Sequence, residues 1–290
     1  MKGWFHEIFV VPVLDIPLRY YGNLSSDGSW GDGVLKGNEL FIYPVYDGIP
    51  LFVDVSSIDR SKILKRADEY LRLIKSNWRS ALRQYRTLPL WGRLCREISS
   101  SDGTILEIGI GPGGGFLPCV IDLNANARVL ANDIDYGVVF AWSRFLKEEG
   151  ITHNVSFAVF DATRIPIKSG SFDVVASFGA VSNIPFNYLA LKELHRVLRA
   201  GGKIVLVEGI IPQEDLSKLP EDIKTHWSSV NPFMIKGYRN FLEQLGFEIK
   251  LYEIYGEKTL TPEDSELARI AANYGATLRF RGVYIVAIKK

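Results

Sequence analysis

The stretch that decides the fold is residues 105–115, which read Ile-Leu-Glu-Ile-Gly-Ile-Gly-Pro-Gly-Gly-Gly. A short apolar run typical of a buried strand leads directly into a turn in which most residues are glycine. Because glycine has no Cβ, it allows a tight turn and lets a ligand approach the backbone closely. The stretch therefore predicts a strand, a ligand-binding turn and the start of a helix, in that order.

Downstream of this turn, strand-like runs alternate with helical stretches. The runs lie at 105–108, 128–133, 155–160, 172–178, 203–208, 247–254 and 282–288, and the clearest helices at 136–149, 187–199 and 236–245. This alternation predicts an α/β fold with a parallel sheet covered by helices on both faces. Only one short candidate helix, at 263–273, separates the last two strands. We therefore expect the last strand to be antiparallel.

Glycines at this spacing are compatible with two kinds of cofactor. Gly109, Gly111 and Gly114 satisfy the G-x-G-x-x-G spacing of dinucleotide-binding turns, and Asp133 lies near the ~20 residues downstream where a ribose-binding acid is expected. Glu107 favours a different ligand. Its carboxylate, at the mouth of the strand, would repel a pyrophosphate and attract a ligand that carries an ammonium and a sulfonium. The alternative is that Glu107 is a strand-end acid in a structural salt bridge.

Six short motifs, taken in order, resemble the class I S-adenosylmethionine-dependent methyltransferases over roughly residues 100–290. Leu-Glu-Ile-Gly-Ile-Gly-Pro-Gly at 106–113 is similar to the family's first motif, and Asn-Asp-Ile-Asp at 132–135 and Phe-Asp-Ala at 160–162 end the next two strands. Ile-Pro-Ile at 165–167, Ser-Phe-Asp-Val-Val at 171–175 and Glu-Leu-His-Arg-Val-Leu-Arg-Ala-Gly-Gly at 193–202 follow. The resemblance implies a Rossmann-like seven-stranded sheet, methyl transfer and S-adenosylmethionine as the cofactor.

The resemblance also implies which residues bind the cofactor. In the family, the acid at the position of Asp133 holds both ribose hydroxyls, and the acid at the position of Asp161 accepts from the adenine amino group. The predicted set is Glu107, Gly109, Gly111, Gly113, Asp133, Ile134, Asp161, Ala162 and Phe178. Three of these have structural alternatives: Asp133 as a helix N-cap, Asp161 as a turn acid and Phe178 as core packing.

The sequence does not identify the methyl acceptor. In the family, the acceptor site is formed by segments that correspond here to 178–185, 210–234 and the helix around 78–85. Residues 177–185 lack the Asn/Asp-Pro-Pro-aromatic signature of adenine amino methyltransferases and the Pro-Cys nucleophile of pyrimidine C5 enzymes. His226 and Asn183 are weak candidates for a catalytic role, with a bystander histidine and a turn asparagine as the alternatives. Methyl transfer needs a base only when the acceptor has a high pKa.

Residues 1–55 are predicted to form a small antiparallel β unit, because apolar runs at 8–14, 40–43 and 51–55 are separated by turn residues. Residues 43–51 resemble the hairpin of small zinc-ribbon-derived modules that accompany some RNA methyltransferases. Those modules often bind zinc through cysteines, and this stretch has none. We therefore expect no metal here, and a unit that caps the sheet or mediates a homodimer.

Residues 56–99 are predicted to be largely helical and basic. Apolar residues recur at three- and four-residue steps, at Ile63, Ala67, Tyr70, Ile74, Trp78, Ala81 and Tyr85. Residues 57–59 can cap the start of this helix, and Pro89 ends it. The opposite face carries a stripe of Lys65, Arg72, Arg79 and Arg86, and residues 56–98 hold 11 basic and 4 acidic side chains. The stripe could contact RNA phosphates, pair with the acidic N-terminal unit, or simply be solvated.

Length and composition narrow the function further. The chain has 290 residues, a net charge of +1 and two cysteines, Cys95 and Cys119. No apolar run approaches the ~18 residues of a membrane span. The first seven residues, Met-Lys-Gly-Trp-Phe-His-Glu, do not resemble a signal peptide. We therefore expect a cytoplasmic protein with no membrane partner and no metal site.

Three hypotheses remain open at this point. The favoured one is an S-adenosylmethionine-dependent methyltransferase whose catalytic domain spans 100–290 and whose acceptor is a small molecule rather than RNA. The second is a non-catalytic methyltransferase-like binding subunit. The third, disfavoured by Glu107 and Asp161, is an NAD-dependent oxidoreductase.

Overall fold

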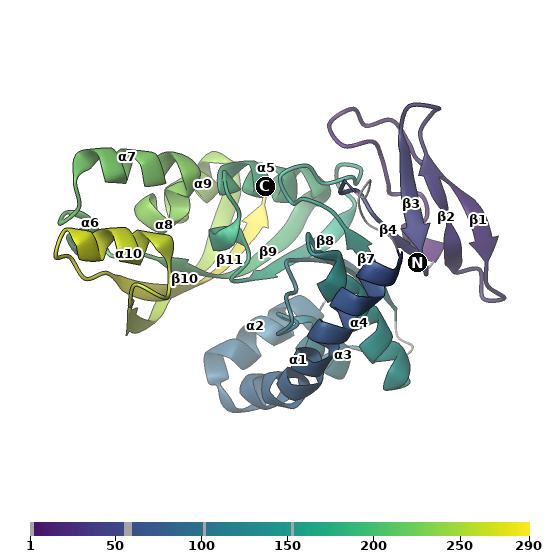
Figure 1. Cartoon of the computed structure of the whole chain (residues 1–290), viewed down its shortest axis with the longest axis horizontal. Coiled ribbons are helices and arrows are strands. Elements are labelled where there is room, and N and C mark those ends of the chain that lie inside the picture. Colours follow the sequence, from purple (N-terminus) through teal and green to yellow (C-terminus); the bar gives the residue numbers. More distant parts are fainter. Residues whose placement is uncertain (1–2, 55–59, 101–102, 152–153) are drawn as a thin grey trace.

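The computed structural model describes residues 3–54, 60–100, 103–151 and 154–290, and Figure 1 shows a large central sheet with a smaller sheet at one end. The central sheet contains β5 (Thr104–Ile108), β6 (Arg128–Asp133), β7 (Val155–Val159), β8 (Phe172–Phe178), β9 (Leu198–Ile210), β10 (Phe247–Thr259) and β11 (Arg279–Lys289). Their order is β10-β11-β9-β8-β5-β6-β7. All seven predicted strands are confirmed.

The direction of the strands also agrees with the prediction. β7, β6, β5, β8 and β9 run parallel to one another, whereas β11 is antiparallel to both of its neighbours, β9 and β10. A parallel connection requires a crossover, whereas β10 and β11 are joined through the short helix α10 (Glu266–Asn273), which packs beyond the sheet. The antiparallel last strand is therefore confirmed.

Helices cover both faces of the central sheet, because its strands are apolar on both sides. Ile105, Val129 and Val174 face a core shared with α2 (Pro89–Ser99), α3 (Leu117–Leu123) and α4 (Tyr136–Glu148). Leu106, Leu130 and Val175 face a second core that contains residues of α5 (Asn187–Val197) and α9 (Arg239–Gln244). Helix α5 ends two residues earlier than predicted, because the buried Leu198 pairs with Phe172 and begins β9.

The long basic helix is present as α1 (Arg60–Thr87). It ends just before Pro89, which is the first residue of α2. The predicted cap at residues 57–59 lies outside the described residues. Ile63 and Ile74 on the apolar face are buried, and the Trp78 ring packs 5.3 Å from the Phe145 ring of α4. The apolar pattern therefore fixes α1 against α4, with its basic stripe in solvent.

The N-terminal sheet is antiparallel, as predicted, but its strands differ from those expected. It contains β1 (Arg19–Leu24), β2 (Trp30–Lys36), β3 (Ile42–Tyr46) and β4 (Ile49–Pro50), after a short 3₁₀ turn η1 (Gly3–Phe5). The prediction of a strand at 8–14 was wrong. The Val10 N–H donates to the Pro166 carbonyl at 3.0 Å, and the Lys168 N–H donates to the Ile8 carbonyl at 2.9 Å, so this run pairs briefly with the connection between β7 and β8.

The two sheets are joined at one edge. Leu51, just after β4, forms a parallel bridge with Val159 of β7, and the Phe52 N–H donates to the Val159 carbonyl at 2.8 Å. Phe9 and Trp30 belong to the same buried cluster as Leu106 of the central sheet. The N-terminal sheet therefore covers the β7 edge and shares a core with the rest of the molecule.

A C-terminal lobe lies at the other end of the central sheet (Figure 1). It consists of α6 (Gln213–Leu216), α7 (Glu221–Val230), α8 (Pro232–Lys236) and α10, packed around their own apolar cluster. Members of this cluster include Leu216, Leu219, Leu267 and Leu278. Within the described part of the chain, no helix combines the length and apolarity that crossing a bilayer would require.

Candidate cofactor and acceptor site

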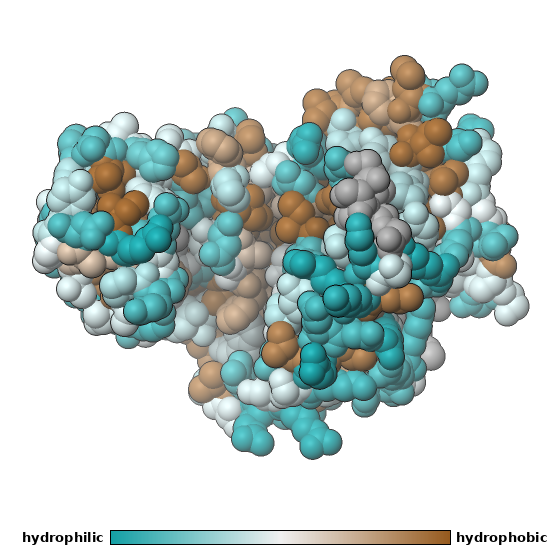
Figure 2. All heavy atoms as spheres, viewed as in Figure 1, coloured by the Kyte–Doolittle hydropathy of each residue, from teal (hydrophilic) through white to brown (hydrophobic). Residues whose placement is uncertain are grey.

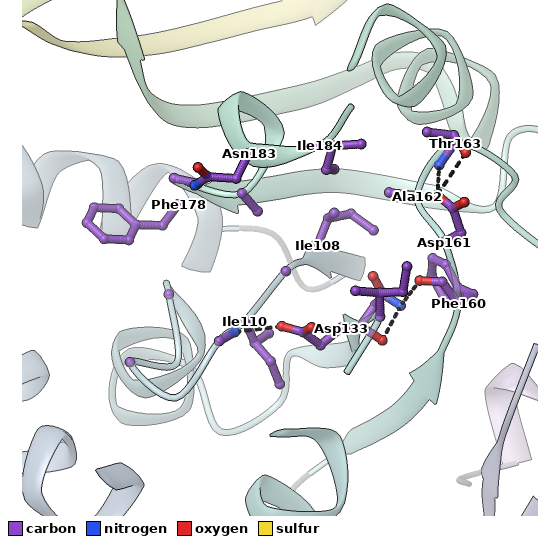
Figure 3. A pocket seen from close by; sticks show the side chains of 18 of the residues that line it. Ile108, Ile110, Asp133, Phe160, Asp161, Ala162, Thr163, Phe178, Asn183 and Ile184 are labelled. Atoms are coloured by element: carbon purple, nitrogen blue, oxygen red, sulfur yellow. Dashed lines mark hydrogen bonds between the residues drawn. The ribbon is translucent and has the colours of Figure 1, made fainter. Parts of the chain in front are cut away.

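A cavity of about 930 Å³ opens at the carboxyl ends of the parallel strands. It lies where β8 and β5 are adjacent, so that the following connections diverge to opposite sides, which is where ligands bind in open α/β sheets. Its wall includes the glycine turn, the ends of β6 and β7, the loop after β8, and parts of α1 and α2. Figure 3 shows several of these side chains converging on one space.

The glycine turn needs glycine for two different reasons. Gly109 and Gly111 have φ values of 64° and 52°, in the left-handed region that other residues rarely adopt. A Cβ on Gly109 would lie 2.2 Å from the Ala180 Cβ, so no larger residue fits there. Gly113 lines the cavity, and a Cβ placed on it meets no protein atom within 4 Å. Its missing side chain therefore leaves room for a ligand.

Asp133 lies beside this turn and faces the cavity (Figure 3). Its Oδ2 accepts from the Gly111 N–H at 2.9 Å, and its Oδ1 accepts from the Asp135 N–H at 2.9 Å. Burial raises the pKa of Asp133 above its ordinary value, against the effect of those N–H donors. The N-cap of α4 is Asp135, whose side chain accepts from the Gly137 N–H, so the helix-cap alternative for Asp133 is not what the structure shows.

The end of β7 supplies a second carboxylate to the cavity. Asp161 Oδ1 accepts from both the N–H and the hydroxyl of Thr163, each at 2.8 Å, so Asp161 is the turn acid of its loop. It nevertheless lines the cavity next to the buried Ala162, and Ile134 lines it from the end of β6. The turn role and the predicted binding role are therefore compatible.

Glu107 occupies a different place from the one its sequence position suggested. Its buried carboxylate lies behind the turn and accepts from the Phe116 N–H, next to the start of α3. A Cβ on Gly115, which does line the cavity, would lie 2.2 Å from Glu107 Oε1. Burial raises the pKa of Glu107 to about 8. Glu107 therefore braces the turn from inside, and its predicted repulsion of a pyrophosphate loses its geometric basis.

The acceptor side of the cavity is formed by the loop after β8 together with α1 and α2. Phe178 is 44% exposed, and its ring meets the Trp91 ring edge-on at 4.9 Å, so it is a wall residue rather than a core residue. Asn183 lines the cavity, and its amide nitrogen donates to the Gly179 carbonyl. Helix α1 contributes Ala81 and Gln84.

Two expected contributions are not brought into the cavity. His226 lies on the exposed side of α7, its nearest ring contact being Trp227 at 5.9 Å, and it is not part of the cavity wall. None of the described side chains of 210–234 lines the cavity either. Of the three acceptor segments that the resemblance implied, only the loop after β8 and the long helix reach it.

The electrostatic character of the described cavity wall is simple. Its only ionisable side chains are Asp133 and Asp161, both on the side of the glycine turn and the β6 and β7 ends. The polar groups on the α1 side are the neutral side chains of Asn77, Ser80 and Gln84. The wall can therefore hold a ligand with hydroxyl and amino donors at one end, and it offers an uncharged surface at the other.

Sequence reasoning missed two residues that shape this cavity. Asn132 is buried, and its amide nitrogen donates to the Phe160 carbonyl at 3.0 Å, which ties the end of β6 to the end of β7. Trp91 stacks on Phe116 at 4.6 Å and supplies part of the acceptor wall. The only sequence signal that could have identified Asn132 is its position directly before Asp133, the acid of the second motif.

Comparison with known proteins agrees with this geometry. Residues 106–206 match the profile of the methyltransferase domain family. A demethylmenaquinone methyltransferase from Lactococcus lactis subsp. lactis (strain IL1403) is 25% identical over 215 residues, which cover 72% of this chain and 84% of that protein. The ubiquinone/menaquinone biosynthesis C-methyltransferase UbiE from Shewanella baltica (strain OS155) is 24% identical over 135 residues, covering 46% of this chain and 54% of UbiE. The match thus spans about half of the second relative.

Among solved structures, a protein of Bacillus halodurans C-125 described as a methyltransferase has the same fold. Its TM-score is 0.52 at 20% identity, with 68% of this chain and 97% of that chain covered. The strand order, the cavity at the divergence of the strands and the domain match together assign this chain to the class I S-adenosylmethionine-dependent methyltransferases. It is an enzyme of that class, with S-adenosylmethionine as its cofactor, and the NAD-dependent and non-catalytic hypotheses are set aside.

Proposed function

We propose that this enzyme methylates an uncharged, apolar small molecule. The observation that carries the proposal is the acceptor side of the cavity, where Trp91, Phe178, Ile184, Phe186 and Leu189 provide an apolar and aromatic surface. Phe178, Phe186 and Leu189 are 44%, 50% and 38% exposed. Apolar area left open in a cavity is favourable only when a ligand covers it.

The cofactor half of the cavity offers hydrogen-bond acceptors of the type that S-adenosylmethionine requires. Asp133 and Asp161 each keep acceptor capacity after their internal hydrogen bonds, which suits the ribose hydroxyls and the adenine amine. Gly113 leaves room against the backbone. Glu107 remains a predicted contributor, acting through the turn that it braces.

The chemistry requires little from the side chains. When bound, S-adenosylmethionine would supply a methyl group on a sulfonium: an electron pair of the acceptor forms the new bond to the methyl carbon, and the sulfur keeps the electron pair of the broken carbon–sulfur bond as a thioether. The wall residues orient the acceptor for in-line attack, and such positioning alone contributes up to ~7–11 kcal/mol in well-aligned reactions. Apart from Asp133 and Asp161 on the cofactor side, the described wall holds no ionisable side chain, so we expect the proton of the acceptor to pass to water rather than to a side-chain base.

RNA is the weaker candidate acceptor. The described cavity wall offers no cation to a phosphate, and the stripe of Lys65, Arg72, Arg79 and Arg86 is exposed on the solvent side of α1. Arg86 pairs with Asp122 at 2.7 Å. Figure 2 shows hydrophilic side chains covering the region of α1 and α4, as a solvated face does. Trp78, the aromatic candidate for base stacking, is packed against Trp142 and Phe145.

The relatives are consistent with an apolar acceptor. The names of two matched proteins refer to demethylmenaquinone and to ubiquinone or menaquinone biosynthesis, and quinones are uncharged ring compounds. We propose the chemical class only. A cytoplasmic location and a homodimer through the N-terminal sheet stay predictions.

The test is transfer of a radiolabelled methyl group from S-adenosylmethionine to three acceptors offered separately. These are a naphthohydroquinone, its sulfonated analogue, which has the same ring and a negative charge, and a single-stranded RNA. We expect label in the uncharged ring, much less in the sulfonated one, and none in RNA. Preference for the sulfonated ring, or label in RNA alone, would contradict the proposal.

A further inference from the structure

The loop after β8 is held from behind. In this acceptor loop, residues 179–186, the residues that line the cavity are Gly179, Ala180, Asn183, Ile184, Pro185 and Phe186. Val181 and Ser182 begin the short 3₁₀ turn η2 (Val181–Asn183) and are only 0% and 5% exposed. The loop thus presents one side to the acceptor and inserts two residues into the protein.

Buried side chains bind all four backbone polar groups of those two inserted residues. The N–H groups of Val181 and Ser182 donate to Glu208 at 3.2 Å and 2.9 Å. The Val181 carbonyl accepts from the Asn187 amide at 3.1 Å, and the Ser182 carbonyl accepts from the Asn231 amide. Glu208, Asn187 and Asn231 are 3%, 0% and 5% exposed. We refer to these three side chains as the clamp.

The clamp connects three elements that are distant in sequence. Glu208 lies on β9, Asn187 begins α5, and Asn231 lies between α7 and α8 in the C-terminal lobe. The Asn187 amide also donates to Asn231 Oδ1 at 2.6 Å, so two clamp residues hold each other. The lobe therefore reaches the acceptor loop, although none of its described side chains lines the cavity.

The conformation of Phe186 shows how tightly the loop is fixed. Its φ is 54°, in the left-handed region that is unfavourable for an aromatic residue. Such strain persists only where the surroundings determine the backbone. Here the Phe186 N–H donates to the Val230 carbonyl at 2.8 Å, beside Asn231. The strained residue is therefore anchored by the same lobe segment that carries the clamp.

We propose that Asn187, Glu208 and Asn231 are positioning residues for the methyl acceptor, which they never touch. They set the place of Asn183, Ile184 and Phe186, and through Asn231 they make the acceptor wall depend on the C-terminal lobe. This inference deepens the proposed function and rests on it for the identity of the ligand. The cofactor half is held by other contacts, above all the Asn132 amide at the ends of β6 and β7.

The contrast between Asn231 and Asn132 provides a matched experiment. Both are buried asparagines whose amide nitrogens bind backbone carbonyls. Asn132 is part of the cofactor side of the cavity wall, whereas Asn231 lies behind the acceptor loop and does not line the cavity. We would measure the affinity of S-adenosylhomocysteine by calorimetry. With that ligand bound, we would measure the affinity of N-phenyl-1-naphthylamine, an uncharged fluorescent probe, for the remaining apolar space.

We expect each variant to weaken the binding of a different ligand. Asn231→Leu leaves the Ser182 carbonyl unpaired in the interior, and losing such a bond should weaken probe binding by about tenfold while the S-adenosylhomocysteine affinity stays within about twofold. Asn132→Leu should do the reverse. A merely structural role would weaken both affinities in both variants. That outcome, or an unchanged probe affinity in Asn231→Leu, would overturn the inference.

Glu208→Gln is the second variant, for use if Asn231→Leu fails to fold. It preserves side-chain shape but turns an N–H₂ toward one of the two backbone donors, so probe binding should again weaken and cofactor binding should not. Probe binding needs no turnover, so this inference can fail or hold independently of methyl transfer. For any acceptor that is methylated, Asn231→Leu should raise KM more than it lowers kcat.

Discussion

At the scale of single residues, alanine substitutions at Gly109, Gly150 and Gly113 distinguish the cost of backbone strain from the loss of space for a ligand. Gly109→Ala has to fit a Cβ 2.2 Å from Ala180 at a φ of 64°, and should destabilise the protein by about 2–4 kcal/mol. Gly150→Ala has a similar φ, 68°, but open space around its Cβ, and should cost only about 1–2 kcal/mol. Urea denaturation of both variants measures the difference.

Gly113→Ala completes this comparison. Its φ is not positive and its Cβ would meet no protein atom within 4 Å, so its stability should equal that of the wild type. Its Cβ would nevertheless project into the cavity, and S-adenosylhomocysteine affinity should fall by about tenfold or more. If Gly113→Ala binds S-adenosylhomocysteine as tightly as the wild type, the glycine turn does not contact the cofactor as we describe.

Glu107 makes a prediction about pH. Burial raises its pKa from 4.5 in the unfolded chain to about 8 in the fold, so the folded state binds the extra proton between these values. Its contribution to stability is therefore complete below pH 4.5 and is lost as the pH rises through about 8. Glu208 behaves in the same direction, with a pKa raised to about 7.

The measurement is the free energy of unfolding from pH 5 to pH 8 for the wild type and for Glu107→Gln. The glutamine cannot ionise, so its stability should fall less over this range, and the difference between the two proteins should grow in favour of the variant. Parallel curves would show that Glu107 is not buried as a protonated acid.

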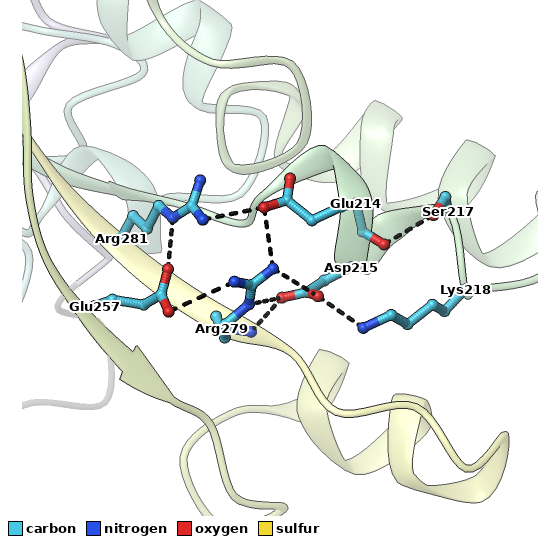
Figure 4. A network of polar contacts seen from close by, with 7 residues as sticks. All are labelled: Glu214, Asp215, Ser217, Lys218, Glu257, Arg279 and Arg281. Carbon is cyan, nitrogen blue, oxygen red and sulfur yellow. Dashed lines mark hydrogen bonds and ion pairs between the residues drawn. The ribbon is translucent and has the colours of Figure 1, made fainter.

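At the scale of elements, an ionic network joins the C-terminal lobe to strands β10 and β11 (Figure 4). Asp215 on α6 has a side chain that is 1% exposed, and its Oδ2 accepts from the N–H and Nε of Arg279 on β11 at 2.9 Å and 2.8 Å. Hydrogen bonding to Arg279 holds the pKa of Asp215 well below its usual range. Removing this carboxylate leaves the Arg279 backbone N–H without its acceptor.

Asp215→Ala should therefore loosen the lobe more than Glu214→Ala does. Glu214 bonds the same Arg279 side chain at 3.0 Å, but it is 54% exposed, and such surface pairs contribute little. Amide hydrogen exchange in α6 to α8 should become at least about tenfold faster in Asp215→Ala and change little in Glu214→Ala. Equal exchange in the two variants would show that the network is not the anchor.

The elements also show what periodicity can and cannot predict. Seven central strands were found because each is a short apolar run between turns, and α1 was found because Ile63, Ala67 and Ile74 repeat on one face. β1 and β2 were missed because their residues are mostly exposed or half-buried and include Gly22, Gly31 and Gly33. Residues 8–14 were misassigned because apolarity alone does not say whether a run pairs with a sheet or with a loop.

At the scale of the whole molecule, the candidate site was predictable wherever it follows from the motifs. Asp133, Asp161 and the glycines lie at strand ends, and the fold brings strand ends together. The place of Glu107 behind the turn was not predictable, because one residue along a strand reverses the side that a side chain faces. Asn187, Glu208 and Asn231 were missed because their partners are backbone groups of a loop.

The fold explains part of the uneven distribution of charge along the chain. The net charge of +1 combines a basic α1 with an acidic N-terminal segment. Arg60 at the start of α1 pairs with Asp32 and Asp47 of the N-terminal segment at 2.8 Å and 3.1 Å, and Arg66 pairs with Asp135 at 2.6 Å. Part of the basic charge therefore stabilises the assembly of the chain and is not available to a polyanion.

The measurement that tests the central claim most directly is a calorimetric titration of the enzyme with S-adenosylhomocysteine, repeated with Asp133→Asn and with the surface control Asp122→Asn. We predict one site per chain, an affinity at least about tenfold weaker in Asp133→Asn because a charge-assisted acceptor is lost, and no change in Asp122→Asn. No binding to the wild type, or equal binding by Asp133→Asn, would contradict the assignment of this cavity to the cofactor.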